Sequence, residues 1–302
     1  MVFNNNDSPS CLDVHPLTFI VAVGFREGIK LFNIFADGIR SNNIHFPLKN
    51  CESIRYAKFG HLLAAGSSHQ IILINPYEDR IIHSIQLNHG YTTKELHFID
   101  KDMYLMGQYG NGSAQVMDLE GVKIFEVWNK SSKLVCSCYD PIFDIMVMAY
   151  EDNEVKFYRE RGEIEFAIMW TYPFIVTKIL IVNELGTAFL GTSSGKVRAY
   201  QWPFTDMIKF NKSYTEIQLH KSSVTQLRIV HDFSYLVSGS EDGSIFISKI
   251  TPYSDGMIVN DSSILHTFKV NKKNYTSLYY LQNYLCTNNG IELEKEERIV
   301  QF

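Results

Sequence analysis

The sequence predicts an all-β fold, a β-propeller of about seven four-stranded blades. Three observations support this prediction. A unit of about 40 to 48 residues recurs along the 302-residue chain. Its apolar and polar residues alternate with the period of a half-buried strand, and no amphipathic helix competes with this pattern. The composition, 45% hydrophobic and 20% charged, suits a large core and leaves too little charge for disorder. We therefore expect residues 1–302 to form one ring.

The first two strands of each unit lead to a small residue. The first strands are CLDVHP, SIRYAKF, TKELHFI, LVCSCYD, VTKILIV, VTQLRIV and YTSLYYL. A second strand then ends at the small position, which is Gly24, Gly66, Gly107, Ala149, Gly191, Gly239 and, in the last unit, Cys286. The spacings between these positions are 42, 41, 42, 42, 48 and 47 residues. This regularity indicates structural repeats.

A tight turn follows each small residue and leads into a third strand. Four residues after the small position stand Gly28, Gln70, Asn111, Asn153, Gly195, Gly243 and Gly290. The last residue of such a turn takes a positive φ, which Gly and Asn tolerate best. We therefore predict structural turns at Gly28, Asn111, Asn153, Gly195, Asp242, Gly243 and Gly290.

An outer strand completes each blade, and the blades must pack side by side because one blade cannot bury both of its faces. The predicted blade cores span about residues 11–35, 52–76, 92–119, 134–159, 176–202, 224–250 and 275–302. The seventh blade is degenerate, since its last segment, IELEKEERIVQF, is unusually polar.

The sequence offers no catalytic or metal-binding motif. None of the ten histidines lies in a His-Glu-x-x-His pattern, and no second cluster joins Cys136 and Cys138. The loop GTSSGKV at 191–197 lacks the spacing of a phosphate loop and the Ser or Thr that would follow Lys196. We predict a protein without enzymatic activity, cofactor or metal, whose five scattered cysteines are buried free thiols.

Charge and hydropathy exclude two classes of partner. The net charge of −5 is spread along the chain, so no basic stripe is available for a phosphate backbone. No run of about 18 apolar residues occurs, and the first ten residues, MVFNNNDSPS, lack the pattern of a signal peptide. We expect neither nucleic acid nor membrane as a partner, and a reducing intracellular compartment.

The units resemble degenerate WD repeats. LNHGYTTKELHF and LHKSSVTQLRI look like the opening segment of that family, and SGSEDGSIFISK looks like its tight turn, although no Trp-Asp pair occurs. The resemblance implies that His220, Ser238 and Asp242 form the hydrogen-bonded network that fixes a blade.

Longer stretches resemble one branch of this family. DVHPLTFIVAVGFREGIKLFNI, TKILIVNELGTAFLGTSSGKVRAYQWP and VTQLRIVHDFSYLVSGSEDGSIF are similar to the second propeller of the cilia- and flagella-associated protein 57 family, also called WD repeat-containing protein 65. The resemblance covers about residues 11–250. It implies a scaffold of the motile-cilium axoneme that binds inner dynein arms or associated regulatory complexes on doublet microtubules.

That family carries another propeller before this one and a coiled coil after it. If residues 1–302 are the whole protein, we expect a separate chain to supply these parts. If they are a fragment, the same polypeptide supplies them. A general intracellular WD-repeat adaptor in another multiprotein complex is the alternative function.

Loops between the first two strands of each blade are candidates for partner binding, because rigid blades hold such loops in place. They contain His15, Pro16, His61, Asp100, Lys101, Asp140, Pro141, Glu184, His231 and Asp232. The excursion at 201–217 adds Trp202, Phe204 and Phe210, since aromatic residues are common interface hot spots. The alternative, that these aromatic residues cover an outer strand, is left open.

Overall fold

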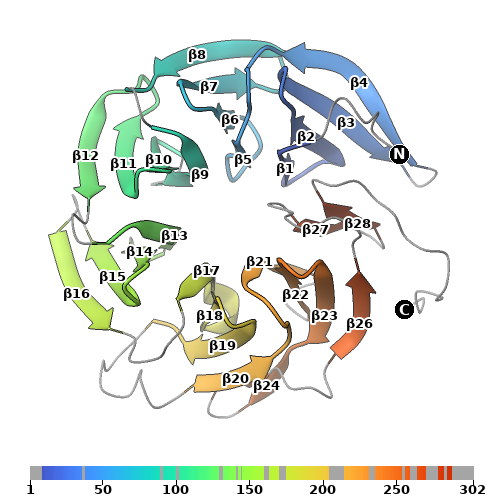
Figure 1. Cartoon of the computed structure of the whole chain (residues 1–302). Coiled ribbons are helices and arrows are strands. Elements are labelled where there is room, and N and C mark those ends of the chain that lie inside the picture. The colour runs from blue at the N-terminus through green and yellow to red at the C-terminus, as the bar shows by residue number, and fades with distance from the viewer. Residues whose placement is uncertain are drawn as a thin grey trace.

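The computed structural model describes residues 9–35, 38–88, 91–99, 102–128, 132–140, 142–143, 145–159, 163–169, 175–203, 214–230, 235–253, 256–258, 264–269, 278–281 and 284–287. They form an all-β ring of blades, as Figure 1 shows.

Six four-stranded antiparallel sheets form the blades, and each sheet has its strands in chain order from the centre outwards (Figure 1). We call the four strands a, b, c and d. Blade 1 contains β1 (Cys11–Val14), β2 (Ile20–Gly24), β3 (Ile29–Phe35) and β4 (Gly38–Phe46), and blade 2 contains β5 (Ser53–Tyr56), β6 (Leu63–Gly66), β7 (Gln70–Asn75) and β8 (Arg80–Gln86). Blade 3 contains β9 (Thr93–Ile99), β10 (Tyr104–Tyr109), β11 (Ser113–Asp118) and β12 (Lys123–Trp128).

Blade 4 contains β13 (Leu134–Asp140), β14 (Ile145–Tyr150), β15 (Glu154–Arg159) and β16 (Glu163–Met169). Blade 5 contains β17 (Val176–Val182), the short 3-10 helix η1 (Asn183–Leu185), β18 (Thr187–Thr192), β19 (Lys196–Gln201) and β20 (Tyr214–Gln218). Blade 6 contains β21 (Val224–Val230), β22 (Tyr235–Ser240), β23 (Ser244–Lys249) and β26 (Ile264–Lys269), with the hairpin of β24 (Thr251–Tyr253) and β25 (Gly256–Ile258) inserted between its c and d strands.

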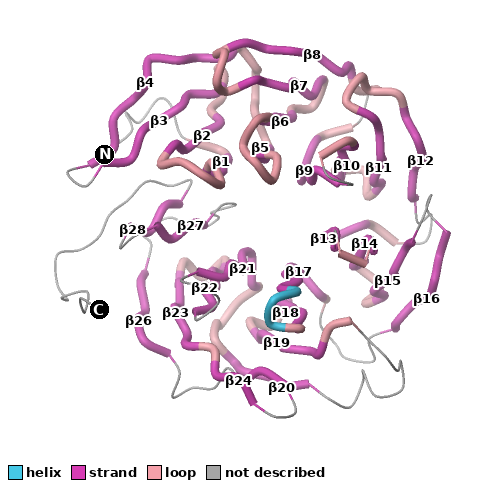
Figure 2. The backbone as a smooth tube through the Cα atoms, turned by 180° about the vertical axis from the view of Figure 1, so that it is seen from behind, coloured by secondary structure: helices cyan, strands magenta, loops and turns pink. Residues whose placement is uncertain are grey.

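A two-stranded sheet occupies the seventh position of the ring. It consists of β27 (Leu278–Leu281) and β28 (Tyr284–Thr287). Strand β27 contacts β21 of blade 6 and β1 of blade 1, and both views place the sheet between those blades (Figures 1 and 2). The all-β propeller is therefore confirmed, with six four-stranded blades where about seven were predicted. Gly290 and the rest of the last predicted segment lie outside the described residues.

An apolar cluster lies between each pair of neighbouring blades, because each repeat buries its faces against the repeats beside it. One cluster packs Ile29 and Phe46 of blade 1 against Ile54 and Ile72 of blade 2. Four further clusters join blades 2 and 3, 3 and 4, 4 and 5, and 5 and 6 in the same way. The core therefore lies in the seams between blades.

The small position at the end of the b strand is explained by the neighbouring blade. A Cβ on Gly66 would lie 2.5 Å from the side chain of Thr93 in blade 3, and one on Gly191 would lie 2.6 Å from Val224 in blade 6. At Gly24 the same atom would meet the sulfur atoms of Cys11 and Cys51, at 2.6 and 2.8 Å. A larger residue at these positions would push the seam apart.

Blade 3 corrects the predicted alignment by one residue. Gln108 pairs with Ala114, six residues on, as Gly191 pairs with Val197. The turn residue of blade 3 is Gly112, four residues after Gln108, so Gln108 and not Gly107 occupies the small position. Gln108 reaches across the seam instead of keeping it narrow, because its amide donates to Val135 O at 3.1 Å and accepts from Ser137 Oγ at 3.0 Å.

The predicted turns differ in backbone conformation. Gly28, Asn153, Gly195 and Gly243 have φ values of 153°, 68°, 83° and 81°. In blade 3 the positive φ belongs to Gly112, at 84°, and not to Asn111. Asn111 instead accepts hydrogen bonds from the backbone and hydroxyl of Ser113 at 3.0 and 2.8 Å.

The prediction of buried free thiols is confirmed for Cys11, Cys51 and Cys136, while Cys138 is free and only partly buried. Cys11 and Cys51 lie on opposite sides of the seam between blades 1 and 2, with their sulfur atoms 3.7 Å apart. Burial is the main cause that raises the pKa of Cys51, so its thiol stays protonated.

Candidate functional site

The ring has two faces with different loops. In an antiparallel blade, the a–b and c–d loops emerge at one edge, and the b–c loops and the d–a connections emerge at the other. We call these two surfaces the a–b face and the b–c face. The a–b face contains, for example, the loops after β1 and β5, and the b–c face contains the tight turns that follow the small positions.

The a–b face of blades 1–4 exposes large apolar side chains. Leu17 is 68%, Phe59 57% and Ile142 65% exposed, each in an a–b loop. Every strongly exposed large apolar residue of the described chain lies in an a–b or c–d loop, or at the end of a strand that adjoins a c–d loop. We call this set the apolar arc: Leu17, Phe19, Phe35, Phe59, Tyr77, Ile81, Ile82, Met103, Val122, Ile124, Ile142 and Phe143.

Most strongly exposed side chains described on the b–c face are polar. Its exposed loop residues include Arg26, Glu27, His69, Asn111, Glu151, Asp152 and Glu241. Exposed apolar patches on a soluble protein mark interaction sites more often than scattered single residues do. The contrast therefore points to the a–b face as the candidate binding surface.

Buried polar side chains hold the loops of the apolar arc in place. His15 has this role at the loop of blade 1 that lies beside blade 2. His15 is 2% exposed and packs edge-on against the ring of Tyr56, with centroids 5.0 Å apart. Its Nδ1 accepts a hydrogen bond from Leu17 N at 3.2 Å, and its Nε2 lies 3.2 Å from Tyr77 Oη. Burial lowers the pKa of His15, which keeps the ring neutral. The loop that carries Leu17 is thus tied to blade 2.

Carboxylates cross this seam and the next one. Asp13 of blade 1 accepts from Tyr56 N at 2.6 Å, and Asp102 of blade 3 accepts from Lys58 N, with both oxygens at 3.2 Å. Lys58 N belongs to the loop that exposes Phe59. Hydrogen bonds to a charged acceptor are stronger than neutral ones, so they hold these loops firmly.

Asp140 anchors the arc over blades 4 and 5. This fully buried carboxylate accepts from Ile142 N at 2.8 Å and from the side chain of Asn183 in blade 5 at 3.0 Å. It also accepts from the indole nitrogen of Trp202, whose buried ring stacks on Phe157. The loop that carries Ile142 and Phe143 is therefore held in place by Asp140 and its partners in blade 5.

The structure divides the predicted binding residues into three groups. Pro16, His61 and Glu184 are exposed on the a–b face. His15, Asp140 and Trp202 are buried, so their side chains hold the loops in place and cannot meet a partner directly. The remaining candidates, Asp100, Lys101, Pro141, His231, Asp232, Phe204 and Phe210, lie outside the described residues. A role in binding stays a prediction for the exposed group.

The exposed candidates predicted from the sequence and the apolar arc share the a–b face, but the apolar residues of the arc were not among those candidates. Leu17, Phe59 and Ile142 each lie within two residues of a predicted candidate. The signal was present, because an apolar residue in a loop that should be polar is unusual unless it is functional.

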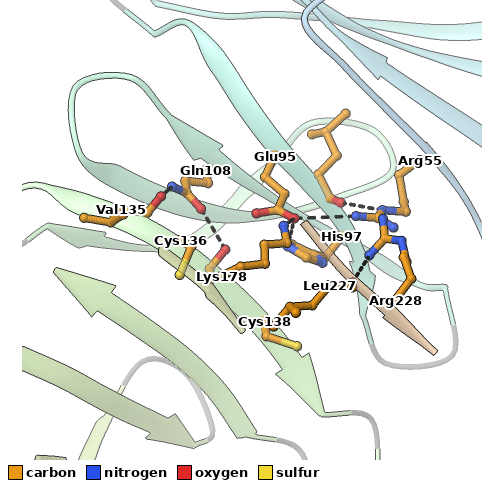
Figure 3. A network of polar contacts seen from close by, with 12 residues as sticks. Arg55, Glu95, His97, Gln108, Val135, Cys136, Cys138, Lys178, Leu227 and Arg228 are labelled. Carbon is orange, nitrogen blue, oxygen red and sulfur yellow. Dashed lines mark hydrogen bonds and ion pairs between the residues drawn. The ribbon is translucent and has the colours of Figure 1, made fainter. Parts of the chain in front are cut away.

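The centre of the ring holds a cluster of charged side chains from four blades (Figure 3). Glu95 of β9 pairs with Lys178 of β17 at 2.5 Å and with Arg55 of β5 at 3.6 Å. His97 lies 3.8 Å from the same carboxylate, and Figure 3 shows Arg228 of β21 near Arg55. The inner strands of non-adjacent blades are therefore joined across the ring axis.

The protonation states of this cluster are fixed near neutral pH. Burial acts to raise the pKa of Glu95, but Lys178, His97 and Arg55 outweigh it and lower the pKa to about 2. Burial lowers the pKa of His97 to about 3, although Glu95 opposes this change. A general acid or base works best when its pKa lies near the working pH. Neither group meets that condition.

Two thiols beside the cluster are also unreactive. Burial raises the pKa of Cys138 to about 11 and raises that of Cys136 further. Thiolates are the nucleophiles and metal ligands, so protonated thiols suit neither role. Within the described chain, no group of three His, Cys, Asp or Glu residues has the arrangement of a metal site.

A second polar network lies at the b–c face, in blade 6. His220 Nε2 lies 2.9 Å from Ser238 Oγ, and its Nδ1 lies 2.6 Å from Ser244 Oγ. Asp242 accepts from Ser244 N and from Lys221 N, both at 2.8 Å. The network implied by the WD resemblance is present, with Ser244 placed between His220 and Asp242.

Comparison with known proteins agrees with this architecture. The family model described as "WD domain, G-beta repeat" matches residues 211–247, which contain the network around His220. Two solved propellers are similar over the whole fold. The WD40 β-propeller domain of Doa1 has a TM-score of 0.72 at 13% identity and covers 95% of this chain and 91% of that one. The β-propeller domain of Myceliophteria thermophila Cps50 (Swd1) has a TM-score of 0.71 at 11% identity, over 90% and 88%.

Two curated relatives are similar in sequence. Cilia- and flagella-associated protein 57 of Mus musculus is 24% identical over 246 residues, which are 79% of this chain and 19% of the relative. Cilia- and flagella-associated protein 57 C of Tetrahymena thermophila is 22% identical over 282 residues, 81% of this chain and 20% of the relative. The chain thus spans about a fifth of the relatives it matches. The chain is a WD40 β-propeller that resembles cilia- and flagella-associated protein 57. Among the described residues, no helix is long and apolar enough to cross a membrane.

Proposed function

We propose that this propeller is a non-enzymatic scaffold of the motile-cilium axoneme, which binds inner dynein arms or associated regulatory complexes on doublet microtubules. The observation that carries the proposal is the similarity to cilia- and flagella-associated protein 57 from a mammal and from a ciliate, over about four fifths of the chain. Similarity to the Doa1 and Cps50 propellers supports the fold alone, because identity there is 13% and 11%.

The a–b face supports a binding role. Its apolar arc spans four successive blades and stands on buried polar anchors, as a pre-formed interface would. The central cluster supports the absence of catalysis, because its carboxylate stays ionised and its imidazole stays neutral near pH 7. We propose that the ring is completed by a seventh blade to which β27 and β28 contribute.

The partners in this proposal are axonemal proteins. They include the propeller and the coiled coil of the related family, supplied by the same polypeptide or by a separate chain. The scaffold would hold these parts against one another, since propellers present rigid loops to several partners at once.

Fractionation of a tagged protein in ciliated cells tests the proposal. We expect the protein to stay with axonemes after detergent removes the ciliary membrane and to leave only under strong salt. A wholly cytoplasmic, detergent-soluble pool would contradict the axonemal role. Proximity labelling dominated by vesicle, ubiquitin or RNA-processing proteins would favour a general adaptor instead.

A matched pair of variants tests whether the a–b face is responsible for retention of the protein on axonemes. Leu17→Ser, Phe59→Ser and Ile142→Ser together should reduce retention strongly, since all three side chains are exposed on the a–b face. The control combines Arg26→Ser, His69→Ser and Glu151→Ser on the b–c face and should be retained normally. Thermal unfolding of both purified variants shows whether the fold is intact.

A further inference from the structure

We propose that the apolar arc is a docking site for an amphipathic α-helix of another protein, with its apolar stripe on the loop tips of blades 1–4 and Lys or Arg along its flank. The inference rests on the proposed function, because it gives the chemistry of a partner that the scaffold binds. It concerns the surface itself and not the cellular location.

The arc is a surface built in advance. Leu17, Phe59 and Ile142 are exposed, while the backbone beside each is bonded to a buried side chain: His15, Asp102 and Asp140. Loops held in this way lose little conformational entropy on binding. The apolar tips are therefore ready to pack against a partner without rearrangement.

At blade 5 the chain supplies a contacting segment of its own. The hairpin β24–β25 leaves blade 6 between its c and d strands, at the a–b end of β23, and β25 contacts the outer strands β19 and β20 of blade 5. Trp202, at the end of β19, is buried. Over blades 1–4, none of the described segments covers the arc in this way. The segment that the chain places beside blade 5 therefore has no described counterpart over blades 1–4.

The partner is a helix and not an added strand, because the loops have few free backbone donors. Leu17 N, Ile142 N and Tyr77 N already donate to the side chains of His15, Asp140 and Asn75. Strand addition depends on main-chain hydrogen bonds along an open edge, whereas a helix binds through side chains at helical spacing. The loop tips of the arc offer apolar side chains but no open strand edge, so they suit a helix.

Acidic side chains at the outer margin of the arc favour basic residues along the flank of the bound helix. Asp79 and Glu120 are exposed in the c–d loops of blades 2 and 3 and form no ion pair within the described residues. Arg80, beside Asp79, is already paired with Glu78 at 2.5 Å. The margin therefore favours a basic flank through electrostatic complementarity.

Two labelled peptides test the proposal against the 302-residue chain. Both are helical, about 18 residues long, and carry the same Leu and Ile stripe; one has Lys along its flank and the other has Glu. In fluorescence anisotropy, we expect the Lys peptide to bind at least about tenfold more tightly at low salt. The difference should shrink as salt rises, because screening weakens exposed charge pairs.

Two sets of variants separate the apolar and the charged contributions. Leu17→Ser, Phe59→Ser and Ile142→Ser together should weaken both peptides at least about tenfold. Asp79→Asn with Glu120→Gln should remove the preference for Lys and keep the apolar binding, and Asn tolerates the φ of 51° at residue 79. The matched control, Glu27→Gln with Glu151→Gln on the b–c face, should change nothing.

Several outcomes would overturn the inference. They are binding of neither peptide, equal binding of both at low salt, or an effect of the b–c control as large as that of the arc variants. Flotation with vesicles of phosphatidylcholine and phosphatidylserine that depends on Leu17 and Phe59 would assign the arc to lipid instead. These results are independent of axonemal retention, so a failure here is distinguishable from a failure of the proposed function.

Discussion

The hairpin after β18 and the loop after β13 lie on opposite faces of the ring and are stabilised differently. In the first, Gly195 N donates to Thr192 O at 3.1 Å, and Thr192 Oγ1 accepts from Lys196 N at 3.1 Å. In the second, Asp140 binds its own loop and also Asn183 and Trp202 of the next blade. In the first loop these hydrogen bonds stay within the hairpin, whereas in the second loop they cross the seam to blade 5.

This difference explains how one face can expose apolar residues without losing its shape. Exposed Ile142 and Phe143 gain nothing from the core, so the loop that carries them needs another source of order. Asp140 supplies it, through charge-assisted hydrogen bonds in a buried environment. The comparison implies that anchors of the a–b face matter for stability and that its tips matter for binding.

The largest expected effect is the loss of an anchor of the a–b face. Trp202→Ala should destabilise the protein by about 3–5 kcal/mol, because it opens a cavity beside Phe157 and leaves Asp140 without its indole partner. Urea unfolding measures the change, with Trp202→Phe as a control that keeps most of the apolar packing. A loss below about 1 kcal/mol would mean that the loop base is not held as described.

The next effect is a loss of stability in mild acid. Burial lowers the pKa of His220 to about 4, from a usual value near 6.5. Above pH 6.5 His220 is neutral in both the folded and the unfolded state, so its full contribution to stability is present. As the pH falls from 6.5 to about 4, His220 takes up a proton in the unfolded state and stays neutral in the folded state, so the free energy of unfolding decreases. Each pH unit in this window should cost about 1.4 kcal/mol.

His220→Asn tests this assignment by removing the titrating group. Urea unfolding at several pH values between 7 and 5 should give a shallower pH slope for the variant than for the parent. His97, whose pKa is lowered to about 3, contributes a similar slope and stays as an internal reference. An unchanged slope in His220→Asn would contradict the burial of a neutral ring at that site.

A smaller effect is expected at the turn of the b–c face. Asp242→Ala removes the acceptor for Ser244 N and Lys221 N and should cost about 1–3 kcal/mol. The contacts lie at the end of one blade, so the cost should be less than that of Trp202→Ala. Thermal unfolding of both variants gives the ranking, and the reverse order would break the comparison of the two faces.

The smallest effect is expected at a tip of the a–b face. Phe59→Ser should change the free energy of unfolding by no more than about 0.5 kcal/mol, because the side chain is 57% exposed. Ile54→Ser, at a buried position of the same blade, is the contrasting control. A large loss in Phe59→Ser would show that this ring supports the fold and is not reserved for a partner.

The blades could be predicted because their signal is local. Gly66 and Gly191 are small because the neighbouring blade approaches them closely, and the strands around them alternate regularly. In blade 3 the search for a small residue selected Gly107, whereas Gln108 occupies the equivalent position and Gly112 is the turn residue. A rule based on the small residue alone misplaces a blade in which a polar side chain takes that position.

The candidate site could be predicted only in part, for a physical reason. The a–b loops were found from the strand pattern, but the orientation of His15, inward, and of Leu17, outward, depends on Tyr56 and Tyr77 of another blade. The contacts of Glu95 with Lys178 and Arg55 likewise join distant parts of the chain. Contacts of this range leave no trace in spacing or composition.

Hydroxyl-radical footprinting tests most directly whether the a–b face is the one that binds. The 302-residue chain would be oxidised free in solution and again while retained on axonemes, and the modified peptides would be compared by mass spectrometry. We predict that Met103, Phe59 and Leu17, all exposed in the free chain, become protected, while His69 on the b–c face stays reactive. Protection of His69 with Met103 and Phe59 still reactive would contradict the account.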